Sequence, residues 1–101
     1  MRLTEVERQT LKETAKACFG DATVVRLFGS RADDSKRGGD IDLLIETQAT
    51  DPAYVAAAHM RFVAAIYTAL GEQKLDVLID YPMRQSRAPI YAVARNEGVV
   101  L

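Results

Sequence analysis

The sequence predicts a single α/β (α+β) domain spanning residues 1–101, in which helices cover one face of a small mixed sheet of three to four strands. Segments with helical spacing of apolar residues are interspersed with short β-branched runs, in the order α-β-β-α-β-α-(β). A chain of 101 residues has room for one hydrophobic core. No repeat or linker-like stretch divides it, so we expect one folded unit.

The predicted helices have clear start and stop signals. The first begins with a capping box at Thr4 and ends at Gly20. The second is long; it begins at Asp51, which is followed by a proline suited to the first turn, and it ends at Gly71. A shorter third helix ends at Gly98. Because the apolar residues of each segment recur every three or four positions, each helix has one face for the core.

The predicted strands are short and apolar. Residues 24–28, 41–45 and 75–79 are rich in valine, leucine and isoleucine, and residues 99–101 are long enough for a small edge strand. The polar, glycine-bearing residues 31–39 separate the first two strands and are predicted to form a loop. With helices on one face of the sheet, we expect the other face to carry polar side chains.

Composition narrows the possible functions. Thirteen Lys and Arg residues against fourteen Asp and Glu give a net charge of −1, which argues against a domain that binds long nucleic acids. The single cysteine, Cys18, rules out an intrachain disulfide and is predicted to be a buried apolar residue. No signal peptide or membrane span is expected, so the predicted location is the cytoplasm.

Several aspartates lie on the predicted second and third strands, although aspartate is disfavoured in strands. Asp40 and Asp42 are two residues apart along the second strand, so both side chains are expected on one face. Asp76 has the same parity on the third strand, with Asp80 as an alternative on the same face. Clustered carboxylates repel one another unless a cation compensates them, and an oxygen-only set favours Mg²⁺ or Mn²⁺.

A Gly-Ser pair ends the first strand and suggests a phosphate-binding turn. Gly29 allows the backbone to approach a ligand closely, and Ser30 adds a hydroxyl to the exposed amide groups. Arg31, Lys36 and Arg37 follow in the same loop and are candidates for contacts with phosphate oxygens. A phosphate-binding turn beside metal-binding carboxylates predicts nucleotidyl transfer.

The order of these motifs resembles the DNA polymerase β-like nucleotidyltransferase superfamily, in its minimal nucleotidyltransferase (MNT) branch. The resemblance covers about residues 24–101, with the motifs between 24 and 80. The family pattern is Gly-Ser, a variable loop, Asp-x-Asp and a third Asp on the next strand. Its residues match Gly29, Ser30, Asp40, Asp42 and Asp76.

The resemblance implies an enzyme that transfers AMP from ATP to a hydroxyl group with the help of Mg²⁺. In this family, Asp40 and Asp42 would hold both metal ions, and Asp76 would hold one and help to deprotonate the acceptor. Proteins of the MNT type are often antitoxins that add AMP to a tyrosine of a partner HEPN-domain toxin. The resemblance therefore implies a HEPN toxin as partner.

Other interpretations of the same residues remain open. The domain is alternatively a nucleotidyltransferase for a small molecule, such as an aminoglycoside, or a non-catalytic antitoxin that acts by binding alone. Asp40 and Asp42 are alternatively solvent-facing strand residues, and Gly29-Ser30 a simple tight turn. Arg31 is alternatively the partner of a surface carboxylate.

Overall fold

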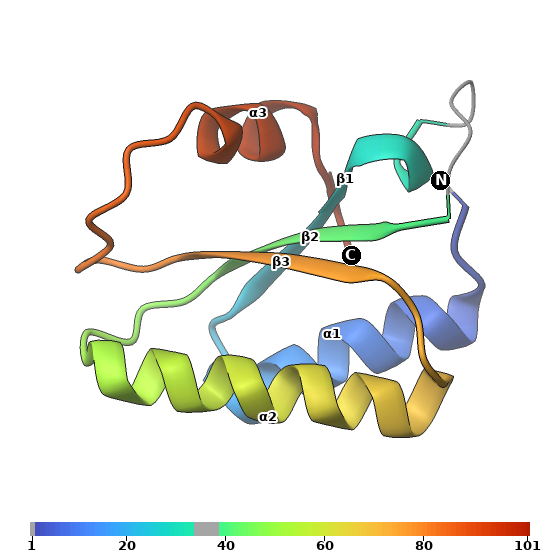
Figure 1. Ribbon diagram of the computed structural model, residues 1–101, viewed down its shortest axis with the longest axis horizontal. Coiled ribbons are helices and arrows are strands. Elements are labelled where there is room, and N and C mark those ends of the chain that lie inside the picture. Colours follow the sequence, from blue (N-terminus) through green and yellow to red (C-terminus); the bar gives the residue numbers. More distant parts are fainter. Residues whose placement is uncertain (1, 34–38) are drawn as a thin grey trace.

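The computed structural model describes residues 2–33 and 39–101 and contains the predicted elements in the predicted order (Figure 1). They are α1 (Glu5–Phe19), β1 (Val24–Phe28), the 3₁₀ turn η1 (Gly29–Arg31), β2 (Ile41–Glu46), α2 (Pro52–Leu70), β3 (Leu75–Asp80), α3 (Ile90–Glu97) and β4 (Val99–Val100). The strands form a mixed sheet in the order β3-β2-β1-β4. β2 is parallel to β3, whereas β1 is antiparallel to both β2 and β4. The predicted α+β class and mixed sheet are confirmed.

The main core lies between the sheet and a layer formed by α1 and α2 (Figure 1). Leu11 of α1 and Phe62 of α2 are completely buried in it, together with Leu27 and Leu43 of the sheet. Cys18 is buried at the end of α1, as the sequence predicts. Because the strand side chains alternate, the same strands direct their remaining side chains to the opposite face.

The opposite face of the sheet is partly covered by α3, which corrects the expectation that all helices pack on one face (Figure 1). Ala94 of α3 is completely buried in a second cluster with Phe28 and Leu44, and Leu78 and Tyr91 pack against this cluster. The physical reason is that β2 is apolar at three consecutive positions, so it presents a leucine on its otherwise polar face. The acidic residues therefore share their face with a small apolar patch and its covering helix.

Helix α2 bears on the expectation that the chain has no membrane span. It is long and apolar enough to cross a membrane by length and composition alone, because it is rich in alanine and Arg61 is its only Asp, Glu, Lys or Arg. Its residues Val55, Ala58, Phe62 and Ile66 are nevertheless buried in the main core. This stripe is the packing expected for the core helix of a compact domain.

The predicted capping box at the start of α1 provides a first testable prediction. The Thr4 hydroxyl accepts a hydrogen bond from the Glu7 amide at 3.0 Å, and the Glu7 carboxylate accepts one from the Thr4 amide at 2.9 Å. Thr4→Ala is expected to lower the free energy of unfolding by about 1 kcal/mol, measured by urea denaturation. Thr50→Ala, at an exposed loop position, is the control. Equal effects of the two substitutions would contradict a role for the cap.

Candidate functional site

Asp42 and Asp76 lie side by side on the face of the sheet that carries α3. The parallel register of β2 and β3 pairs Asp42 directly with Asp76, and β1 places Phe28 on the other side of Asp42. The two carboxyl groups are close enough for a hydrogen bond between them. The shared parity predicted from the sequence is thus confirmed for this pair.

The surroundings of Asp42 disfavour its ionised form. Burial raises the pKa of Asp42, and the negative charges of Asp76 and Asp40 and the hydrogen bond with Asp76 raise it further. The positive charge of Lys74 acts in the opposite direction and only partly compensates. A carboxylate pair in this condition is stabilised either by a proton or by a cation placed between its oxygens.

Gly29 closes directly over the Asp42 carboxylate. Its φ of +74° lies in the left-handed region, and a Cβ added there would stand 2.2 Å from Asp42 Oδ2. Only glycine allows this close approach of the η1 backbone to a carboxylate without a clash. The structure therefore brings together the Gly-Ser turn and the Asp42–Asp76 pair, which are far apart in the sequence.

Asp40 lies just before β2 and is turned toward a different partner. Its Oδ2 is 3.3 Å from the ammonium nitrogen of Lys74, with the two side chains 42% and 72% exposed, respectively. The hydrogen bond and charge of Asp40, followed by the charges of Asp76 and Asp42, raise the pKa of Lys74. In residues 2–33 and 39–101, no group of three or more His, Cys, Asp or Glu side chains is arranged as a metal site.

Arg31 makes its contacts on the other side of the η1 turn. Its Nε donates to the carbonyl oxygen of Gly39 and its Nη1 to that of Arg2, both at 3.1 Å, and Nη1 lies 3.8 Å from a carboxylate oxygen of Glu7. These contacts fasten the N-terminal segment and α1 to the loop after β1. Arg31 thus connects these segments, and its contacts are with them and not with the Asp42–Asp76 pair. Lys36 and Arg37 lie outside the described residues.

Asp80, the alternative third carboxylate, belongs to a separate cluster. The register places it beside Glu46, four residues along β2 from Asp42. Its oxygens accept hydrogen bonds from Arg84 and Arg95. Asp80 is therefore already neutralised by arginines, which leaves Asp76 as the partner of Asp42.

Two features of the site were not anticipated from the sequence. One is the ion pair between Lys74 and Asp40, for which the only sequence signal is that Lys74 has the same parity as Asp76. The other is the arginine cluster around Asp80, in which Arg84 comes from the segment after β3 and Arg95 from α3. In comparisons with known proteins, no family model and no curated protein matches the chain. The carboxylate pair and the glycine turn are accordingly the features from which we infer a function.

Proposed function

We propose that this domain is a Mg²⁺-dependent nucleotidyltransferase that transfers AMP from ATP to an acceptor hydroxyl group. The observation that carries the proposal is the contact between Asp42 and Asp76 directly beneath the backbone of Gly29. Adjacent carboxylates, of which Asp42 is partly buried, destabilise a fold unless something compensates them. Their position beside a turn suited to phosphate supports a role in binding a metal–nucleotide complex.

The side chains at the site suit the proposed metal. Asp42 and Asp76 offer only carboxylate oxygens, the donors that Mg²⁺ and Mn²⁺ prefer. Asp40 would join them as the third ligand once released from Lys74. When bound, the metal would neutralise the charge of these carboxylates and of the triphosphate, which is the chemistry that nucleotidyl transfer needs.

The chain's own residues supply the remaining parts of the reaction. Gly29 and Ser30 would hold phosphate oxygens through backbone amides and the serine hydroxyl. Asp76 would accept the proton of the acceptor hydroxyl while the oxygen of that hydroxyl forms a bond to the α-phosphorus of ATP. The bond from that phosphorus to the bridging oxygen then breaks, and pyrophosphate leaves with the electron pair.

We also propose that the acceptor is a tyrosine of a partner HEPN toxin, which would make the domain a cytoplasmic antitoxin. This identification is supported by the resemblance of residues 24–101 to the MNT branch. The geometry is compatible with a protein acceptor, because Asp76 is exposed on β3, an edge strand of the sheet. A bulky partner can approach such an edge without rearrangement of the core.

The proposal is tested by co-expressing the chain with the product of the adjacent gene and measuring the intact mass of that product. We expect one or more AMP additions with the wild-type chain and none with Asp40→Ala/Asp42→Ala. Asp21→Asn, at the exposed turn between α1 and β1, is the matched control and should retain the additions. Tandem mass spectrometry is expected to locate the AMP on a tyrosine.

Other results would select the alternatives. An unmodified partner that co-purifies with both versions and is neutralised by both would indicate an antitoxin that acts by binding alone. AMP transfer to a free aminoglycoside in the absence of any protein partner would indicate a small-molecule enzyme. Additions that persist in Asp40→Ala/Asp42→Ala would contradict the assignment of the carboxylates.

A further inference from the structure

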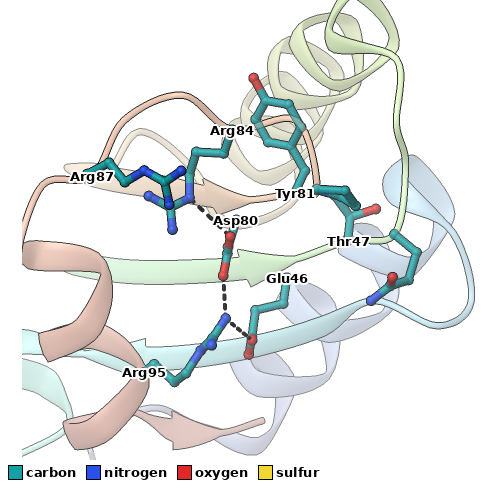
Figure 2. Close-up of a pocket in the computed structure, with 9 residues that line it drawn as sticks. Glu46, Thr47, Asp80, Tyr81, Arg84, Arg87 and Arg95 are labelled. Atoms are coloured by element: carbon teal, nitrogen blue, oxygen red, sulfur yellow. Dashed lines mark hydrogen bonds and ion pairs between the residues drawn. The ribbon is translucent and has the colours of Figure 1, made fainter.

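A second charged site lies at the opposite end of β2 and β3. It is a cavity of about 390 Å³, lined by Glu46, Thr47, Gln48, Asp80, Tyr81, Pro82, Arg84, Arg87 and Arg95 (Figure 2). Glu46 lies four positions along β2 from Asp42, which corresponds to about 13 Å. The cavity is therefore distinct from the carboxylate pair, and the proposed nucleotidyl transfer makes no use of it.

The carboxylates of this cavity are fully engaged by arginines. Oε1 of Glu46 lies 2.5 Å from Nε of Arg26, and Oε2 of Glu46 lies 3.0 Å from Nη2 of Arg95. Oδ1 of Asp80 lies 3.0 Å from Nε of Arg84, and Oδ2 of Asp80 pairs with Nη2 of Arg95. Figure 2 shows Arg95 between the two carboxylates, with Arg84 approaching Asp80 from the other side. Each of the four carboxylate oxygens thus already has a cationic partner.

The arginines, in contrast, retain unused donors. Arg87 lines the cavity and has no hydrogen-bond or ion-pair partner within the part of the chain that the structure describes. A guanidinium group has five N–H donors, and Arg95 contacts Glu46 and Asp80 through Nη2 alone. Arg84 is fixed in place by stacking over the Tyr91 ring, 3.7 Å from its centroid. The cavity consequently offers unused donors and an excess of positive charge.

We propose that this cavity binds a small phosphate ester through Arg87 and the free N–H groups of Arg84 and Arg95. With all carboxylate oxygens occupied, the cavity can recognise an anion but has no free carboxylate for a cation. A phosphate group suits these three guanidinium groups, two from the segment between β3 and α3 and one from α3, because its oxygens point in several directions and each accepts charge-assisted hydrogen bonds. The volume exceeds that of inorganic phosphate and falls within the range of small-ligand sites.

The test is a titration of the ¹⁵N-labelled chain with AMP in EDTA, followed by NMR at constant ionic strength. We expect saturable shifts at the Thr47 and Gln48 amides and at the Arg87 Nε. Arg87→Gln should raise the Kd for AMP about tenfold, since it removes charge-assisted hydrogen bonds. Arg61→Gln on α2 removes the same charge outside the cavity and should change the Kd by less than about twofold.

Parallel titrations distinguish the sources of the anion. Weaker binding of inorganic phosphate than of AMP would support a phosphate ester, whereas equal binding would assign the site to the free ion and overturn the ester. Acetate binding as tight as AMP binding would overturn the preference for phosphate. Shifts confined to residues 29–32, shifts that never saturate, or an unchanged Kd in a folded Arg87→Gln chain would each contradict the proposed site.

Discussion

Gly29→Ala is expected to lower the free energy of unfolding by about 3 kcal/mol, a large part of the roughly 5–15 kcal/mol typical of small domains. Two costs contribute. An alanine at φ +74° pays about 1–2 kcal/mol for the left-handed conformation. Its methyl group would also stand 2.2 Å from Asp42 Oδ2, and relieving this overlap costs about 1–3 kcal/mol. Urea denaturation monitored by circular dichroism measures the total.

Gly71 provides a matched control that separates the two costs. Its φ is +83°, close to that of Gly29, but a Cβ there has no atom within 4 Å. Because its ψ is 176°, Gly71 has a backbone conformation that is essentially restricted to glycine, and Gly71→Ala should show a conformational cost of about 1–3 kcal/mol without any clash. In Gly29→Ala/Asp42→Ala the carboxylate that the methyl group would overlap is absent. The loss of unfolding free energy in this double variant should therefore be clearly smaller than the sum of the two single losses. Equal losses in the two single variants and additivity in the double variant would show that Gly29 does not press on Asp42.

The elements of this fold are predictable because their signals are local. Thr4, Asp51 and Gly71 mark helix ends through their own backbone and side-chain chemistry, and the structure places all three as caps. The adjacency of Asp42 and Asp76 also follows from simple rules. Strand parity fixes the face of each carboxylate, and the parallel pairing of β2 with β3 brings them level.

The position of α3 could not be predicted with the same rules. Periodicity identifies the apolar face of a helix but not the surface that this face will cover. Leu44 and Leu78 were the available signal, since they place apolar side chains on the face that also carries Asp42. Their burial beneath Ala94 becomes evident only when β1, β2 and β3 are assembled.

Long charged side chains were the least predictable part of the site. The guanidinium of Arg31 has several possible partners within its reach, and the packing of α1 against the loop decides among them. The same holds for Lys74, whose flexible stem brings its ammonium to Asp40. In the cluster around Asp80, Arg84 is only four positions away in the sequence, but the contact of Arg95 depends on how α3 packs on the sheet, which no local pattern records.

Asp42→Asn is expected to abolish the proposed nucleotidyl transfer while making the metal-free chain more stable at neutral pH. If Asp42 holds the metal, its loss removes several kcal/mol of transition-state stabilisation, so the rate should fall at least about 1,000-fold. The fold should gain stability, because a neutral amide relieves the repulsion among Asp42, Asp76 and Asp40 and still donates a hydrogen bond to Asp76. We expect a rise of a few degrees in Tm at pH 7 in EDTA.

The pH dependence of this gain identifies its cause. Because the pKa of Asp42 is raised above its ordinary value of 3.8, the folded chain binds this proton more tightly than the unfolded chain. The resulting stabilisation of the wild type is complete below pH 3.8 and is lost as the pH rises through the raised pKa. The stability advantage of Asp42→Asn should therefore grow across that pH interval and then level off, whereas Asp21→Asn should show no such trend.

Mg²⁺ should raise the Tm of the wild type and leave that of Asp42→Asn nearly unchanged, since ligands stabilise only the folded form that binds them. A pH-independent difference would show that the carboxylates do not repel one another in solution, and an equal response to Mg²⁺ would remove Asp42 from the metal site.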